Sequence, residues 1–225
     1  MPNDLRFEPG VADLIGRLHA QSDAQGPAIG AYFGKRAQAG ELDWKGLDAD
    51  AHRFMADKFV ALDPVKAEFC HQLCRALRAK RVVEIGTSYG VSTLYLAAAV
   101  RANGGGLVIG TEYEPEKAKA ARANFAAAGL DDVIELREGD LRETLKTVEG
   151  PIDFVLMDIW TEMARPAIEL VAPHLRPGAI VIADNTAQFT EAYGDYFAYL
   201  EDPANKFTTL TLPFEGGLEM SVRAA

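Results

Sequence analysis

Five short apolar runs separated by helix-length segments constrain the fold of this 225-residue chain more than any other feature. In chain order the runs are RVVEIG, GLVIGTEY, VIELREG, IDFVLMD and AIVIADN, between residues 81 and 185. Continuous apolar runs of this length are typical of parallel strands that are buried on both faces. The segments between them are long enough for crossover helices. The pattern predicts a doubly wound, mostly parallel α/β sheet.

The two ends of the chain differ from this central part. Apolar residues three and four apart predict helices before the first strand, at residues 11–20, 51–62 and 64–79. After the fifth strand and a helix near residues 191–200, KFTTLTLP and GLEMSVR predict two strands joined by a short turn. We therefore expect a seven-stranded sheet with a C-terminal antiparallel hairpin. Residues 1–60 form an N-terminal helical layer in this prediction and residues 61–225 the α/β core of a single domain.

Composition restricts the partners and the compartment. A formal net charge of −10 disfavours nucleic acid, whose binding depends on lysine and arginine. The first ten residues contain charged residues and two prolines, which argues against a signal peptide, and no apolar run is long enough to span a membrane. Cys70 and Cys74, four residues apart, fit neither a disulfide framework nor a CxxC motif. We expect two buried thiols in a cytoplasmic protein.

The stretch VVEIGTSYGVS joins the first strand to the following helix through Gly86 and Gly90. Glycines at this edge of an open α/β sheet allow a ligand to approach the backbone. A nicotinamide dinucleotide fingerprint needs further glycines where this chain has Ser88 and Val91, so the spacing argues against a dehydrogenase. Glu84 instead precedes the first glycine by two residues.

Acidic residues follow the next two predicted strands. Glu112 ends the second strand, where a carboxylate accepts hydrogen bonds from ribose hydroxyls in nucleotide-type sites. Asp140 follows the third strand and has two interpretations. It accepts a hydrogen bond from an adenine amine, or it caps a short helix. The order of these features after three successive strands is more specific than any one of them.

Together with these features, the chain from Leu62 onward resembles the catechol O-methyltransferase-like family of class I S-adenosylmethionine-dependent enzymes. The segments that carry the resemblance are LDPVKAEF, VVEIGTSYGVS, GTEYEP, LREGD, FVLMDIW, LRPGAIVIADN and GGLEMSVR. The resemblance implies a Rossmann-like fold, S-adenosylmethionine as cofactor and methyl transfer to a hydroxyl of a small, aromatic molecule. It also implies a homodimer, the usual form of the bacterial relatives.

The resemblance further assigns roles to residues. Asp158, Asp184 and Asn185 would hold a divalent cation, usually Mg²⁺, through hard oxygen donors. Asp158 and Lys66 would serve catalysis. Cofactor binding would involve Leu62, Glu84, Gly86, Ser88, Gly90, Ser92, Glu112, Tyr113, Asp140, Asp158 and Trp160.

One departure from the family concerns the general base. Metal-dependent members carry a lysine shortly after the first metal aspartate, whereas this chain has Thr161, and a hydroxyl is a poor base near neutral pH. Lys66, His52 and His71 are the candidate substitutes, although we expect Lys66 to be solvated and His71 to be either packed or at the surface. Two other functions stay open: methyl transfer to nitrogen or a carboxylate without a metal, and a non-catalytic S-adenosylmethionine-binding module.

The acceptor pocket is expected between the N-terminal layer, residues 160–165 and the region after Asn185. Aromatic residues in these parts suit either an aromatic acceptor or the hydrophobic core, and we expect core packing. They are Tyr32, Phe33, Trp44, Phe54 and Phe189.

Overall fold

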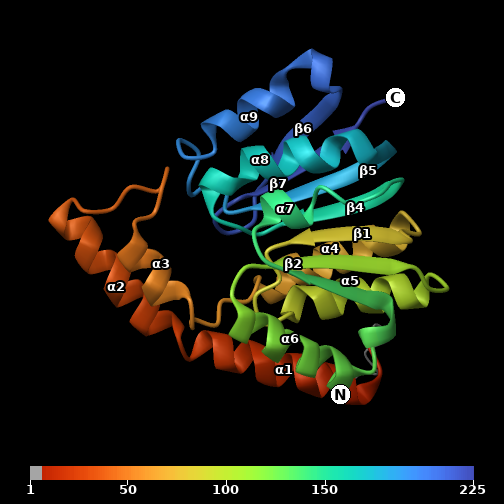
Figure 1. Cartoon of the computed structure of the whole chain (residues 1–225), viewed down its shortest axis with the longest axis horizontal. Helices are drawn as coiled ribbons and strands as arrows, with labels where there is room; N and C mark the ends of the chain where they lie inside the picture. Colours follow the sequence, from red (N-terminus) through yellow and green to blue (C-terminus); the bar gives the residue numbers. More distant parts are fainter. Residues whose placement is uncertain (1–6) are drawn as a thin grey trace.

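The computed structural model describes residues 7–225 and contains one seven-stranded sheet with the order β3-β2-β1-β4-β5-β7-β6 (Figure 1). Residues 1–6, which include part of the segment used above to argue against a signal peptide, lie outside the described residues. The strands are β1 (Arg81–Ile85), β2 (Leu107–Glu112), β3 (Ile134–Glu138), β4 (Ile152–Met157), β5 (Leu175–Asp184), β6 (Phe207–Leu212) and β7 (Leu218–Arg223). The predicted doubly wound fold is confirmed.

The strands β1 to β5 are parallel, and β1, β2, β4 and β5 are covered on both faces, whereas β3 at the sheet edge is partly exposed. Side chains alternate between the faces, so Val82 and Phe154 join one core cluster while Val83 and Val155 join the other. The first face is covered by α4 (Pro64–Ala76), α5 (Val91–Ala102) and α6 (Pro115–Ala128). The second is covered by α7 (Leu141–Thr144), α8 (Thr161–Val171) and α9 (Gly194–Glu201). This two-sided burial explains why the strands read as continuous apolar runs.

The C-terminal strands form the predicted hairpin. β7 pairs antiparallel with both β5 and β6, and its register places Glu219 opposite Ala183 and Thr211. The connection from Leu212 to Leu218 closes with a hydrogen bond from Gly217 N to Phe214 O at 2.8 Å. The hairpin turn lies beside the carboxyl end of β5, because Asn185 N donates to Gly217 O at 3.1 Å.

The chain before the first strand is helical, as predicted. α1 (Pro9–Asp23) packs against α5 and α6, whereas α2 (Gly26–Ala39) and α3 (Ala49–Met55) project from the body (Figure 1). No residue of α2 is buried. We call residues 26–57, which include α2 and α3, the arm.

The predicted helix at residues 51–62 ends early, at Met55. Side chains from the end of α1 bind the backbone that follows, since Phe59 N donates to Gln25 Oε1 at 3.0 Å and Ala61 N donates to Ser22 Oγ at 2.9 Å. These tertiary hydrogen bonds satisfy groups that a longer helix would satisfy internally. They also bury Phe59 and Leu62. Phe59 stacks on Tyr89 in the loop at residues 86–90, which we call the cofactor loop or glycine loop.

Cys70 and Cys74 are free thiols and fully buried in α4, as expected. Burial raises the pKa of the Cys70 thiol. Within residues 7–225, no helix is long and apolar enough to cross a membrane.

Candidate active site

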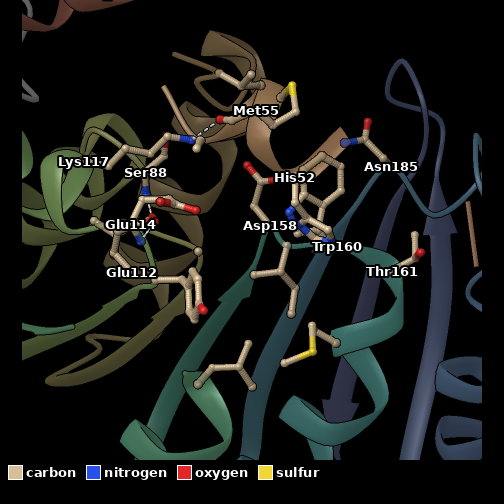
Figure 2. Close-up of a pocket in the computed structure, with 18 of the residues that line it drawn as sticks. His52, Met55, Ser88, Glu112, Glu114, Lys117, Asp158, Trp160, Thr161 and Asn185 are labelled. Carbon is tan, nitrogen blue, oxygen red and sulfur yellow. Dashed lines mark hydrogen bonds between the residues drawn. The ribbon is translucent and has the colours of Figure 1, made fainter. Parts of the chain in front are cut away.

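A cavity of about 960 Å³ lies between the carboxyl ends of β1, β2 and β4 and the arm (Figure 2). This is the edge of an open α/β sheet at which ligands bind. Most of the predicted cofactor residues line it: Leu62, Gly86, Ser88, Ser92, Glu112, Tyr113, Asp140, Asp158 and Trp160. Glu84 and Gly90 are not among its lining residues. The fold thus brings residues that lie up to nearly a hundred positions apart in the chain together around one cavity.

The structure gives a different explanation for Gly86 and Gly90 from the expected one, which was that glycines let a ligand approach the backbone. Both adopt positive φ, of 97° and 85°. A Cβ on Gly86 would lie 2.1 Å from the Asp158 carbonyl oxygen, and one on Gly90 would lie 2.4 Å from the Phe125 ring. The chain's own backbone and core therefore occupy the space that a side chain would need, so these glycines serve the tight turn and its packing.

Glu84 is a buried carboxylate near the carboxyl end of β1. Its Oε2 accepts hydrogen bonds from Thr87 Oγ1 at 2.9 Å and from the Thr93 hydroxyl, while its Oε1 is buried with no hydrogen-bond partner among the described residues. Burial raises the pKa of Glu84 to about 7 despite these hydroxyl groups. The nearby Ser88 Oγ also lacks a partner within residues 7–225. Unsatisfied buried groups of this kind are costly unless a ligand completes them.

Glu112 holds the cofactor loop in place (Figure 2). Its Oε2 accepts a hydrogen bond from Ser88 N at 2.6 Å, and its Oε1 accepts one from Glu114 N at 2.8 Å. Each carboxylate oxygen has a second lone pair, and the residue faces the cavity. Ser88 reaches this position through a positive φ of 50°. Next to it, Tyr113 is 69% exposed.

Asp140 fits one of its two interpretations directly, because it caps α7 by accepting a hydrogen bond from Arg142 N at 2.8 Å. It also forms an ion pair with the Arg142 guanidinium at 2.5 Å, which lowers the pKa of Asp140. Asp140 and Arg142 therefore form part of the cavity wall as an ion pair. The sequence analysis did not single out Arg142. The adenine role remains a prediction.

Lys66 is buried, contrary to the expectation that it is solvated. Its Nζ donates to Asp184 Oδ1 at 2.5 Å, and the two residues are only 4% and 5% exposed. Neither lines the cavity, whereas Asp158 does. Burial raises the pKa of Asp158, and the neighbouring carboxylates of Asp184 and Glu84 raise it further. Lys66 is thus a buried counter-ion rather than a base that faces an acceptor.

The predicted Mg²⁺ ligands do not make a ready metal site. The Lys66 ammonium already neutralises Asp184, and the same Asp184 oxygen accepts a hydrogen bond from Asn185 N at 2.8 Å. The Asn185 amide oxygen lies against the hairpin, 2.7 Å from where a Cβ on Gly216 would be. Among residues 7–225, no three histidine, cysteine, aspartate or glutamate side chains cluster as a metal site. A divalent cation would have to compete with an ammonium group for one carboxylate, so these side chains do not fit it.

Thr161, which replaces the family lysine, is used structurally. Its hydroxyl donates to the Trp44 carbonyl oxygen in the arm. The next residue, Glu162, accepts a hydrogen bond from Leu47 N at 3.1 Å through Oε2. The start of α8 therefore anchors the arm over the cavity, a role that no sequence pattern indicated.

Two further contacts attach the arm from the side of the cofactor loop. Lys117 Nζ donates to Met55 O at 3.0 Å (Figure 2). Tyr89 OH donates to Asp57 O at 3.1 Å. Burial lowers the pKa of Lys117. Lys117 was not singled out from the sequence, because a lysine on a helix reads as a solvated residue.

The five aromatic residues form a half-buried cluster. Tyr32 stacks on Phe54 with ring centroids 3.8 Å apart, and Trp44 packs against Phe33 at 5.2 Å and Phe189 at 4.5 Å. Phe189 packs against a core cluster, as expected, whereas the four arm residues belong to neither core cluster. Phe33, Trp44 and Phe189 also line the cavity.

Comparisons with known proteins agree with this architecture. The sequence model of a family described as a methyltransferase domain matches residues 83–186. A catechol O-methyltransferase from Mycobacterium tuberculosis is 36% identical over 127 residues, which cover 56% of this chain and 57% of that relative. The match therefore spans little more than half the length of that relative.

Two solved structures share the fold. A cofactor-bound protein from MTB is 26% identical, with a TM-score of 0.67 over 87% of this chain and 97% of that chain. The O-methyltransferase from Bacillus cereus in complex with SAH is 24% identical, with a TM-score of 0.65 over 72% of this chain and 82% of that chain. The matched segment includes the glycine loop, Glu112 and Asp158, so residues 83–186 are similar to a methyltransferase domain, and the aligned part of the chain is similar to a catechol O-methyltransferase.

Proposed function

We propose that this protein is an S-adenosylmethionine-dependent O-methyltransferase that transfers a methyl group to a hydroxyl of a small aromatic molecule. The observation that carries the proposal is the set of unused acceptors around the glycine loop. Glu112 faces the cavity with free lone pairs for ribose hydroxyls, and the buried Ser88 hydroxyl has no hydrogen-bond partner among the described residues, which leaves it available for a polar group of the cofactor. Glu84 does not line the cavity, so it supports the loop through Thr87 rather than contacting the ligand.

The aromatic cluster supports a planar acceptor. Phe33, Trp44, Phe189 and Trp160 line the cavity, and Trp44 packs against Phe189. Ring faces bind flat, apolar molecules through burial and stacking. The match to a catechol O-methyltransferase and the B. cereus structure named as an O-methyltransferase support a hydroxyl as the accepting group.

In the proposed reaction the residues of this chain position the two reactants. The glycine loop and Glu112 hold the cofactor, and the arm and α8 hold the acceptor so that its oxygen lies in line with the sulfonium methyl group. Positioning of this kind accounts for a large share of the barrier reduction in group transfer. No step is assigned to a metal, because Asp184 is already paired with Lys66.

Titration calorimetry with S-adenosylmethionine and S-adenosylhomocysteine tests cofactor binding. Wild-type protein should bind both, and Glu112→Gln should weaken binding about 10- to 100-fold, the value of losing charged hydrogen bonds. Glu116→Gln is the matched control, since Glu116 lies on the exposed side of α6, away from the cavity. No binding to wild-type protein at millimolar cofactor would refute the proposal.

Formation of S-adenosylhomocysteine with panels of phenols, amines and carboxylates tests the reaction class. Turnover with phenols is the expected result. Turnover confined to amines or carboxylates would favour the alternative acceptors, and cofactor binding without turnover on any class would favour a binding module. These outcomes are distinct from a failure to bind cofactor.

We also propose that the protein is a cytoplasmic homodimer and that each of its chains is a single methyltransferase domain. Two free thiols support a reducing compartment, and α2, which buries none of its residues, supports a contact between copies. Light scattering should give twice the mass of one chain. A monomer at micromolar concentration would contradict the dimer.

A further inference from the structure

His52 lies on the arm at the place where the cavity meets the start of α8. It lines the cavity together with Asp158, Trp160 and Thr161 (Figure 2). We propose that His52 is the general base that takes the proton from the acceptor hydroxyl, with Glu162 as its positioning residue. This inference rests on the proposed function and names the base that the missing lysine leaves unassigned.

The geometry of His52 suits this task. Its Nε2 lies 3.8 Å from Glu162 Oε1, and its ring packs edge-on against Trp160 with centroids 5.8 Å apart. A carboxylate beside an imidazole sets the orientation of the ring and stabilises the imidazolium that forms on proton uptake. Trp160 packs against the ring from another side, so the half-exposed imidazole is held at the cavity wall.

The other candidate bases are occupied elsewhere. Lys66 Nζ is buried on Asp184, and neither residue faces the cavity. His71 is buried with Nδ1 2.9 Å from the carbonyl oxygen of Tyr95, and it does not line the cavity. The Thr161 hydroxyl donates to the arm backbone. Lys117 does face the cavity, but its Nζ donates to Met55 O on the side of the cofactor loop.

The anchoring of the arm is what brings His52 into place. Thr161 and Glu162 hold residues 44–47, and these lead directly into α3, on which His52 lies. Asp48 caps α3 by accepting a hydrogen bond from Ala51 N at 2.9 Å. Thr161 stands where the resemblance implies a lysine, and its hydroxyl helps to hold the segment that leads to His52. The two residues of α8 that anchor the arm are thus Thr161 and Glu162, and Glu162 also lies beside the proposed base.

Charged groups from several elements surround the cavity wall at His52. Glu162 faces it from α8, and Asp158 lines the same cavity from the end of β4. On α3 itself, Asp50 and Arg53 are paired with each other. Arg36 of α2 is paired with Asp48, the residue that caps α3. Both arginines thus have carboxylate partners, and Glu162 supplies the carboxylate oxygen that lies beside the imidazole.

The step balances as follows. The acceptor O–H proton passes to a ring nitrogen of His52, and an oxygen lone pair attacks the methyl carbon of S-adenosylmethionine. The S–CH₃ bond breaks, its electron pair stays on sulfur, and S-adenosylhomocysteine and the methyl ether form. The imidazolium then releases its proton to water, so no oxidant, reductant or metal is needed.

Kinetics of His52→Gln test the proposal on a phenol that wild-type protein methylates. We expect kcat to fall about 10²- to 10⁴-fold, the usual contribution of a general base, with unchanged cofactor affinity. The limb of the kcat/KM profile that falls toward acid pH should disappear. His174→Gln, a histidine in η2 (Ala172–His174) that does not line the cavity, should leave both the rate and the pH profile unchanged. An unchanged pH profile in His52→Gln would overturn the proposal.

A spectroscopic measurement does not depend on turnover. The absorption of 4-nitrophenol bound to the protein with S-adenosylhomocysteine reports whether its hydroxyl is ionised. In wild-type protein the bound phenol should ionise about one pH unit or more below the same phenol in His52→Gln, as a neighbouring imidazolium stabilises the phenolate. Binding with equal ionisation in the two proteins would overturn the role of His52. Failure of phenols to bind wild-type protein would instead overturn the acceptor class of the proposed function.

Glu162→Gln separates positioning from a structural role. The amide oxygen still accepts the hydrogen bond from Leu47 N, so the arm should stay anchored. Without the negative charge, the acidic limb of the kcat/KM profile should move to lower pH, because the imidazole binds its proton less strongly. A limb that does not move would show that Glu162 does not act through His52.

Discussion

The Lys66 ammonium donates to Asp184 Oδ1 at 2.5 Å, and both side chains are buried beneath the floor of the cavity. A resemblance to metal-dependent enzymes assigns Asp184 to a cation. The structure instead gives it an internal cation that cannot dissociate. This pair links α4 to the carboxyl end of β5, so it serves stability as well as the electrostatics of the site.

The first prediction concerns this ion pair. Lys66→Met leaves Asp184 as an unpaired buried charge and should lower the free energy of unfolding by about 3 kcal/mol or more. The double variant Lys66→Met/Asp184→Asn removes both charges and should recover at least half of the loss. Chemical denaturation of both variants, of Asp184→Asn and of wild type completes the cycle. Additive effects in the double variant would contradict direct pairing.

The second prediction concerns metal dependence. Methyl transfer should survive dialysis against EDTA, because Asp184 is neutralised by Lys66 and Asn185 turns its amide oxygen toward the hairpin. The measurement is the rate of S-adenosylhomocysteine formation before and after chelation. A loss of activity that Mg²⁺ restores would show that a cation displaces Lys66 from Asp184.

The third prediction uses the raised pKa of Glu84. Since the pKa is about 7 in the folded protein against an ordinary value of 4.5, the folded state binds more protons between these values. Glu84 therefore destabilises the fold progressively as pH rises from about 4.5 to 7, by roughly 3 kcal/mol at most, at 1.36 kcal/mol per pKa unit. Glu84→Gln should flatten this part of the profile.

Denaturation of wild type and Glu84→Gln from pH 5 to 8 measures the effect. The difference between the two proteins isolates Glu84 from Asp158, whose raised pKa gives a pH dependence of the same sign. A constant difference across this range would contradict a protonated Glu84 in the native state.

The fourth prediction concerns the anchor of the arm. Thr161→Val removes the hydrogen bond to Trp44 O and should raise the acceptor KM about fivefold, which corresponds to about 1 kcal/mol for one hydrogen bond. Thr161→Ser keeps the hydroxyl and is the control. Cofactor affinity should be unchanged in both variants. A loss of cofactor affinity without a change in acceptor KM would show that the arm supports binding of the cofactor rather than of the acceptor.

The sequence by itself predicted the sheet and the cofactor loop. Strands such as β1 are specified by local apolar runs, and the order Gly86, Glu112, Asp140 follows from the rule that parallel strands end at one edge. These features are local in the chain, so their patterns survive without knowledge of packing. Even there, only the tertiary structure showed why glycine is required at these positions, because a Cβ on Gly86 would meet Asp158 and one on Gly90 would meet Phe125.

Only the tertiary structure decided the pairing of Lys66 with Asp184, the path of the arm and the placement of His52 beside Glu162. Each joins residues more than a hundred positions apart, and a lysine or histidine on an amphipathic helix gives the same pattern whether it is solvated, packed or facing a cavity. The extent of the 51–62 helix had the same cause, because Ser22 and Gln25 supply hydrogen bonds that a local pattern does not contain. The chemistry proposed at the cavity depends on such long-range contacts, since a base acts only where the fold brings it to the acceptor.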